Sequence, residues 1–219
     1  MKIGVVCLSL SCMDFIDVLD FVRDIGGEAI ELCTVKGAHN GTLNLAGDNR
    51  LSIPRTVESF GLSITSVAGY NDFASHVTDE LQTQIERLEN YCKLAADLNV
   101  NIVRAMGGDP KPGLSKSQMI ENVIQGFKIA VEMAGQYGVI LALENHGTII
   151  NDGPALMKII DEVASDNLTL TLDTGNFCWA GFSLDESYEY FKQLVPYVAN
   201  VHLKDVVSDA GNEALFVPL

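Results

Sequence analysis

The chain has 219 residues, enough for one domain with a full hydrophobic core, and no break in composition divides it, so we expect a single domain over residues 1–219. Hydrophobic residues make up 47% and charged residues 20% of the sequence, which excludes a disordered chain. The formal net charge of -15 disfavours nucleic acid as a partner, because an acidic surface repels phosphate backbones. A small anion such as a sugar phosphate stays compatible with this charge.

The five cysteines do not suggest a disulfide framework, because their number is odd and no C-x-x-C pair occurs. The apolar start MKIGVVCLSLSC is interpreted as a buried strand rather than a signal peptide. The apolar run is short, it has no small-x-small cleavage site, and Asp14 and Asp17 follow at once. No apolar run reaches the roughly 18 residues of a membrane helix. We therefore expect a cytoplasmic protein with no membrane partner.

Short apolar runs rich in Val, Ile and Leu alternate with longer segments of helical period. Because these runs are apolar almost throughout, they predict parallel strands that are covered on both faces. The predicted strands are residues 2–8, 28–33, 63–68, 101–106, 139–144, 168–173 and 200–205.

Apolar residues between the predicted strands recur at three- and four-residue steps, so they line one face of each predicted helix. The clearest faces are Leu81, Ile85, Leu88, Cys92, Ala95 and Leu98; Ile120, Val123, Ile124, Phe127, Val131 and Ala134; and Leu184, Tyr188, Phe191 and Val195. Start signals agree with these helices, since Ser183 and Glu186 have the spacing of a capping box and Pro154 suits a first helical turn.

Seven strand–helix repeats leave two α/β folds to choose between. A doubly wound open sheet would usually carry a glycine-rich first turn, and the first turn here, LSLSCMD, has no glycine. Glu144, Asp173 and His202 follow one another at an equal spacing of about 29 residues, which favours a (β/α)8 TIM barrel and predicts an eighth strand ending at about residue 231. We therefore expect a barrel truncated after its seventh strand. Bare strand edges could then pair with a further copy in a homo-oligomer.

Polar residues of ligand type stand where the later predicted strands end, and the active site of a barrel lies at the carboxyl ends of its strands. Glu144, Asp173 and His202 come from three successive strands. Two carboxylates and one imidazole suit a divalent metal such as Mn, Mg, Co or Zn. Such a metal could hold two oxygens of a hydroxy-ketone while Glu144 moves a proton next to the carbonyl. Glu31 could point inward from its strand as a supporting partner, and we assign it no catalytic role.

Five further residues near these strand ends are candidate substrate contacts: Arg104, His146, Asn176, Trp179 and Lys204. Arg104, His146 and Lys204 could bind substrate oxygens, and Lys204 could also bind a phosphate. Trp179 could form an apolar wall against a sugar ring, or it could be a plug in the loop layer. His146 and Asn176 could instead brace the turns in which they lie.

The candidate ligands also have structural interpretations that the sequence leaves open. Glu144 could be paired with Arg104 or Lys204. Asp173 could cap its own TGN turn, and His202 could be a half-buried histidine with satisfied hydrogen bonds. Lys204 could likewise serve only as an ion-pair partner of a nearby carboxylate.

The segments ENHG, DTGN and HLKD, in this order on consecutive strands, resemble the sugar phosphate isomerase/epimerase branch of the xylose isomerase-like barrels, as does SITSVAGYNDF. The resemblance covers Met1 to Leu219. It implies that Glu144, Asp173 and His202 are three of four metal ligands. The fourth, a Glu in a Gly-Glu-Gly segment of the eighth strand, would follow FVPL (216–219) and so lie beyond the sequence.

The leading hypothesis is a metal-dependent isomerase or epimerase that acts on a sugar or sugar phosphate. A second hypothesis is an inactive or incomplete barrel that binds a ligand without transforming it. A third is a metal hydrolase of the endonuclease IV type. That branch uses several metals and many more than the four histidines present here, and the net charge is wrong for DNA.

Overall fold

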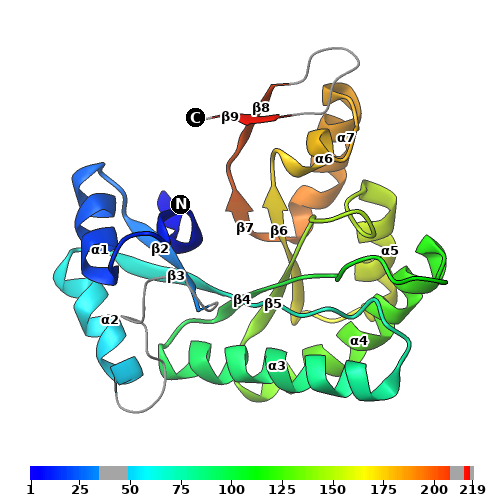
Figure 1. The fold of residues 1–219 in the computed structure, drawn as a ribbon, viewed down its shortest axis with the longest axis horizontal. Coiled ribbons are helices and arrows are strands. Elements are labelled where there is room, and N and C mark those ends of the chain that lie inside the picture. The colour runs from blue at the N-terminus through cyan, green and yellow to red at the C-terminus, as the bar shows by residue number, and fades with distance from the viewer. Residues whose placement is uncertain (35–48, 208–214, 218–219) are drawn as a thin grey trace.

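The structure of the protein is a computed structural model that describes residues 1–34, 49–207 and 215–217. Seven parallel strands lie in chain order, β1 to β7, in one sheet and alternate with helices. The sheet curves into an open half-barrel with the helices on its outer side (Figure 1). The predicted α/β class and TIM-barrel arrangement of seven strands are confirmed.

The bounds of the elements follow the predicted alternation. The strands of the sheet are β1 (Gly4–Val6), β2 (Ala29–Cys33), β3 (Ser63–Ala68), β4 (Ile102–Ala105), β5 (Ile140–Glu144), β6 (Leu168–Asp173) and β7 (Val198–His202). The helices are α1 (Phe15–Asp24), α2 (Asn49–Ser59), α3 (Thr78–Asp97), α4 (Lys116–Gln136), α5 (Gly153–Val163), α6 (Asn176–Trp179) and α7 (Leu184–Leu194), with short 3-10 helices η1 (Cys7–Leu10) and η2 (Val195–Tyr197). A separate antiparallel pair, β8 (Asp205–Val207) and β9 (Leu215–Val217), follows β7.

Two predicted strands differ from the structure by more than one residue at their ends. The run 2–8 is a strand only up to Val6, after which the chain turns into η1. The run 200–205 was placed too late, because β7 ends at His202. Lys204 therefore lies in the connection between β7 and β8 rather than in a strand.

The side chain of Thr174 explains where β7 ends. Thr174 N donates to His202 O at 3.0 Å. Beyond it, Thr174 Oγ1 accepts from Lys204 N at 2.9 Å and donates to Lys204 O at 2.8 Å. The hydroxyl thus takes the place of a strand partner, and it fixes the backbone of Lys204 beside the end of β6.

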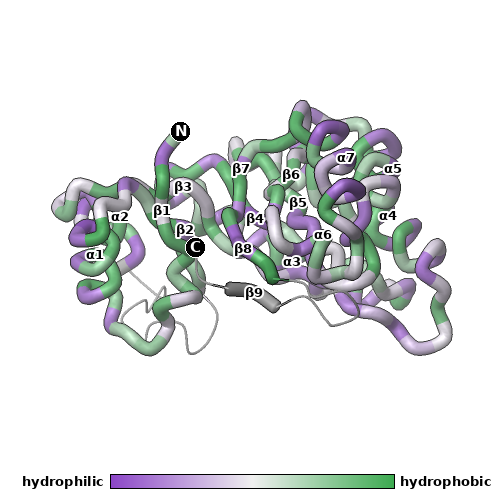
Figure 2. The backbone as a smooth tube through the Cα atoms, turned by 90° about the horizontal axis from the view of Figure 1, so that it is seen from above, coloured by the Kyte–Doolittle hydropathy of each residue, from purple (hydrophilic) through white to green (hydrophobic). Residues whose placement is uncertain are grey.

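The core lies between the sheet and the helices. All five residues of β2 are buried, and the helices pack buried apolar residues such as Leu88, Phe127 and Ile159 against the strands. Hydrophobic and hydrophilic positions are interspersed along helices such as α1 and α7, as expected for helices with one face on the sheet (Figure 2). Within the described ranges, no helix has the length and apolar character needed to cross a bilayer.

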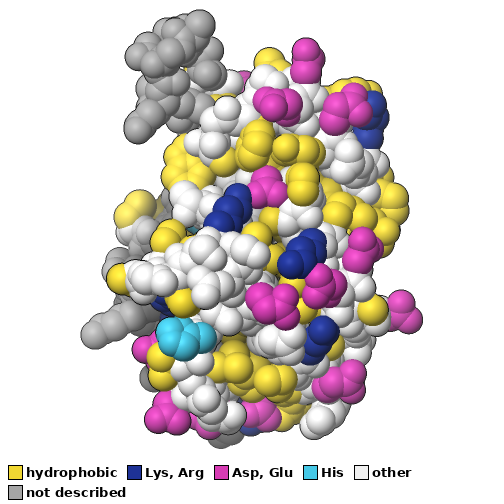
Figure 3. Space-filling view, turned by 90° about the vertical axis from the view of Figure 1, so that its right-hand side faces the viewer, with side chains coloured by type: hydrophobic (Ala, Val, Ile, Leu, Met, Phe, Trp, Pro, Cys, Tyr) yellow, Lys and Arg dark blue, Asp and Glu magenta, His cyan; other side chains and the backbone are white. Residues whose placement is uncertain are grey.

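The apolar face predicted on 184–195 forms, but much of it is on the surface. Leu184, Tyr188 and Val195 are exposed, whereas Ser187 and Leu194 of α7 are buried. In the described structure α7 packs on α5, α6 and η2. Figure 3 faces the side of the molecule that carries α4, α5 and α7 and shows hydrophobic side chains grouped between charged ones.

Candidate metal centre

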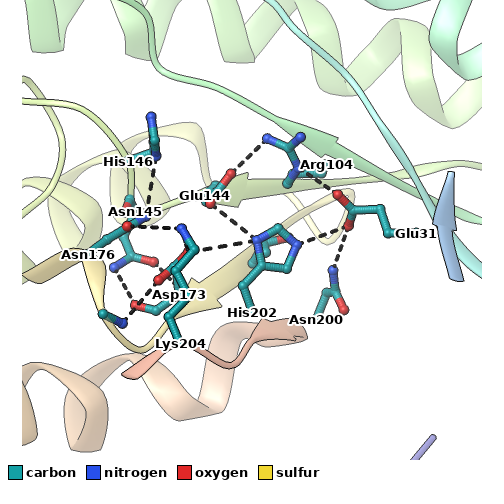
Figure 4. Close-up of polar contacts among 12 residues, drawn as sticks. Glu31, Arg104, Glu144, Asn145, His146, Asp173, Asn176, Asn200, His202 and Lys204 are labelled. Carbon is teal, nitrogen blue, oxygen red and sulfur yellow. Dashed lines mark hydrogen bonds and ion pairs between the residues drawn. The ribbon is translucent and has the colours of Figure 1, made fainter. Parts of the chain in front are cut away.

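The three predicted ligands are the last residues of three adjacent strands: Glu144 of β5, Asp173 of β6 and His202 of β7. Asp173 pairs directly with His202, and Glu144 pairs with Thr171, which lies on the same face of β6 as Asp173. The side chains therefore converge inside the half-barrel (Figure 4). One ligand atom from each of the three lies within 4.8 Å of the others, so the structure brings together the predicted group.

The geometry of the group is centred on one ring nitrogen. His202 Nδ1 lies 3.2 Å from Glu144 Oε1 and 3.9 Å from Asp173 Oδ2. All three side chains are nearly or completely buried. Burying charged groups is costly unless they are paired, so the surroundings of each carboxylate decide what the group can bind.

The two oxygens of Asp173 have different surroundings. Oδ1 accepts from Gly175 N at 3.0 Å, so the predicted cap of the turn does form. Oδ2 is buried and has the Lys204 ammonium as an ion-pair partner at 2.6 Å, yet among the described residues no donor makes a well-directed hydrogen bond to it. Burial raises the pKa of Asp173, and the nearby charge of Lys204 offsets this only in part. A buried oxygen in this state, beside a second carboxylate and an imidazole, fits a divalent metal.

Around His202, charged groups of alternating sign form a closed ring. Arg104 donates through Nε to Glu31 Oε1 at 2.9 Å and through a terminal nitrogen to Glu144 Oε2 at 2.7 Å. His202 completes the ring, with Nε2 3.1 Å from Glu31 Oε2 and Nδ1 facing Glu144. The ion pair of Glu144 with Arg104 and its place in the ligand group therefore exist together.

The ring shifts the pKa values of its members in opposite directions. Burial alone would raise the pKa of Glu31 and Glu144, but the hydrogen bonds from His202 and the charge of Arg104 outweigh it and lower both to about 2. Burial alone would lower the pKa of His202, but its hydrogen bonds to the two carboxylates outweigh it and raise the pKa to about 9. At neutral pH the metal-free ring therefore holds a protonated His202.

The Arg104 side chain is buried next to the ligand group rather than exposed at its entrance. The guanidinium is buried, binds both carboxylates of the ring and stacks over the Tyr70 ring at 5.0 Å. Charge from the two carboxylates raises its pKa even though burial lowers it. These contacts favour a supporting role for Arg104 over the predicted contact with substrate oxygens.

The other predicted substrate contacts lie on the side of the group near α6. The His146 and Trp179 rings are stacked, with centroids 6.0 Å apart and planes 21° apart. Trp179 is 42% exposed, so it is not a buried plug. The Lys204 side chain is 37% exposed and pairs with Asp173. Asn176 is buried, donates to Asn145 O at 2.9 Å and accepts from Lys204 Nζ at 3.4 Å, so it braces its neighbours.

Two residues beside the ligands, Asn145 and Glu31, make more contacts within the site than the sequence indicates. Asn145 clamps the backbone of Asp173, accepting from its N–H at 2.7 Å and donating to its carbonyl at 3.0 Å. Glu31 binds Arg104 and His202 at once. The available signals were an amide directly after a strand-end carboxylate, and one acid within the apolar strand 28–33.

Parallel βα units with ligand-type residues at the strand ends define a TIM-barrel protein with a candidate metal centre at its carboxyl rim. The sequence matches the family described as xylose isomerase-like TIM barrel over residues 19–217, so the chain belongs to this family, as predicted. None of the curated proteins compared with the sequence matches it.

Several solved structures share the fold. The probable 3-DHS dehydratase AsbF of Bacillus anthracis superposes with a TM-score of 0.78 at 23% identity, over 96% of this chain and 76% of that one. The IOLI protein with a binding zinc atom gives 0.78 at 18% identity, over 95% and 74%. D-psicose 3-epimerase in the presence of D-fructose gives 0.77 at 15% identity, over 94% and 73%. At these identities the likeness shows the fold.

Proposed function

We propose that the protein is a metal-dependent isomerase or epimerase that moves a proton next to the carbonyl group of a sugar or sugar phosphate. The observation that carries the proposal is the convergence of Glu144, Asp173 and His202, with the buried Asp173 Oδ2 lacking a well-directed donor within the described part of the chain. The epimerase and the zinc-binding protein of the same fold support this class of reaction and the need for a metal.

Glu144, Asp173 and His202 would hold a divalent metal ion, with Mn, Mg, Co and Zn as the candidates. When bound, the ion supplies Lewis acidity that polarises a carbonyl oxygen and stabilises the negative charge left by proton removal. Glu144 keeps its negative charge at neutral pH, so it could hold a cation.

Glu144 is the proposed base. The low pKa of Glu144 applies to the metal-free site, in which a protonated His202 donates to Oε1. Arg104 holds Oε2 and so orients the carboxylate that would take up the substrate proton.

The exposed side of the site is suited to a polyhydroxylated substrate. Lys204 is a partly exposed cation that can turn to a substrate oxygen or phosphate, and Asn176 lies within 3.4 Å to guide it. The stacked pair of His146 and Trp179 offers one aromatic face and one polar ring. Aromatic faces commonly pack on the apolar faces of bound rings.

Proton exchange with solvent tests the proposal. The manganese-loaded protein is incubated with ketohexoses and their phosphates in D2O, and proton NMR follows loss of the signal next to the carbonyl. We expect exchange with the wild type and with Glu132→Gln, an exposed glutamate of α4, and none with Glu144→Gln. If Glu144→Gln retained proton exchange, Glu144 would not be the base. Binding of metal and sugar without exchange would favour a ligand-binding protein, and salt-sensitive DNA binding would favour the hydrolase.

A further inference from the structure

Glu31 is a buried acid in the middle of an apolar strand, and its carboxylate contacts three other strands. It is 4% exposed. Oε1 accepts from Arg104 Nε at 2.9 Å. Oε2 accepts from Ser66 Oγ at 2.8 Å and Asn200 Nδ2 at 3.2 Å, and lies 3.1 Å from His202 Nε2. Both oxygens are therefore engaged by donors from β3, β4 and β7.

This position is costly for the fold. An apolar residue within β2 would bury without penalty, whereas a buried carboxylate needs a full set of partners. Glu31 reaches across the half-barrel to β7, which is 171 residues away in sequence at His202. The carboxylate of Glu31 thus ties the inner face of β2 to one of the candidate metal ligands (Figure 4).

We propose that Glu31 is a positioning residue that selects which nitrogen of His202 binds the metal. The inference rests on the proposed metal centre but not on the proposed reaction. Nε2 faces Glu31, whereas Nδ1 faces Glu144 Oε1 at 3.2 Å and Asp173 Oδ2 at 3.9 Å. A ring N–H that donates to a carboxylate leaves the lone pair on the other nitrogen, so Glu31 directs the lone pair of Nδ1 at the ligand group.

The same carboxylate also orients a second candidate ligand. Glu31 Oε1 holds the Arg104 guanidinium through Nε, and a terminal nitrogen of that guanidinium holds Glu144 Oε2. Oε1 of Glu144 is thereby turned towards His202 Nδ1. One acid on β2 thus sets the direction of ligand atoms on both β5 and β7.

The substitution Glu31→Gln tests the role of the carboxylate with little change in the volume of the side chain. A glutamine has nearly the same shape, but one of its oxygens becomes an NH2 group. Donors face both oxygens of Glu31, so the NH2 group must oppose either Arg104 or the side with Ser66, Asn200 and His202. The variant can satisfy one side only. Glu28→Gln, at an exposed position just before β2, is the matched control.

The test is calorimetric titration with Zn²⁺ alone, combined with nitrogen NMR of the histidine rings in the zinc-loaded wild type. We expect Glu31→Gln to bind zinc about 10- to 100-fold more weakly, the usual effect of removing the partner of a metal-binding histidine, and Glu28→Gln to match the wild type. We expect NMR to show zinc on Nδ1 of His202 and a proton on Nε2.

Two results would overturn the inference: equal zinc affinity of Glu31→Gln and the wild type, or zinc on Nε2 of His202. If Glu31→Gln does not fold, the wild-type spectrum alone decides between the two nitrogens. A wild type that binds no zinc removes both this inference and the proposed metal centre. A wild type that shows the expected zinc results but no proton exchange with any sugar removes only the proposed reaction.

Discussion

Glu144 Oε1 lies 3.2 Å from His202 Nδ1, although the two residues are 58 positions apart in the sequence. The carboxyl ends of β5 and β7 bring a carboxylate and an imidazole together in a buried space. Charge is stable in such a space only when it is paired. In the absence of a metal, a protonated His202 balances the carboxylates together with Arg104 and Lys204. The pH dependence of the protein should therefore report on this contact.

The metal-free protein should lose stability as the pH rises from about 6.5 to about 9. The pKa of His202 is raised from 6.5 to about 9 in the folded state, so the folded state binds this proton more tightly than the unfolded state. The stabilisation is complete below pH 6.5 and is lost as the pH rises through 9, by up to about 3 kcal/mol. Urea unfolding with a chelator present measures it. His202→Gln should remove most of this slope, and an equally steep slope in the variant would contradict the assignment.

Metal affinity should change with pH in the opposite direction. Zinc must displace the proton of His202, so below pH 9 each unit of pH should raise the affinity by about tenfold. Titrations between pH 6 and 8 in buffers of different ionisation enthalpy should show about one proton released per zinc bound. No proton release at pH 7 would mean that His202 is already neutral or is not a ligand.

The sequence predicts the ligand group because a βα repeat has a nearly constant length. The equal spacing of Glu144, Asp173 and His202 places them at corresponding ends of successive strands, and their convergence in the structure follows. The predicted ranges 63–68 and 168–173 coincide with β3 and β6 for the same reason. Local periodicity is sufficient for properties of this kind.

Contacts across the half-barrel could not be predicted in this way. The partners of Glu31 on β7 depend on how strongly the sheet curves, which the pattern of one strand does not contain. The pairing of Lys204 with Asp173 depends on the end of β7, which a threonine side chain on the neighbouring strand decides.

Arg104 should contribute strongly to stability. Arg104→Met would leave the buried carboxylates of Glu31 and Glu144 without the cation that binds both. Removing one member of a buried ion-pair network costs about 3–5 kcal/mol. Urea unfolding of the metal-free protein at pH 7 measures the loss. Arg104→Lys should also be destabilised, since one ammonium cannot reproduce the two-sided contact of a guanidinium. If Arg104→Met were as stable as the wild type, the ring of charged residues would not contribute this free energy to folding.

Lys204→Met should bind zinc more tightly than the wild type at pH 8. The ammonium of Lys204 lies 2.6 Å from Asp173 Oδ2, the oxygen that a metal would need, so the two cations compete. Because the side chain is partly exposed, the gain should be at most about 1 kcal/mol, or about fivefold in affinity. Lys192→Met, an exposed lysine of α7 paired with Glu189, makes the same change in net charge and should have no effect. Weaker binding by Lys204→Met would mean that the ammonium supports the metal site.

Trp179 should report directly on substrate binding, because it is the only tryptophan in the sequence and is 42% exposed beside His146. A sugar ring that covers the indole removes water from it, so its fluorescence emission should shift to shorter wavelength as an active substrate is added. Trp179→Ala should raise KM about fivefold, for a lost stacking contact of about 1 kcal/mol, and leave kcat nearly unchanged, since the contact serves binding in the ground state and the transition state alike. Trp179→Phe keeps an aromatic face and should recover most of the affinity. A fall in kcat at constant KM would instead place Trp179 next to the reacting atoms.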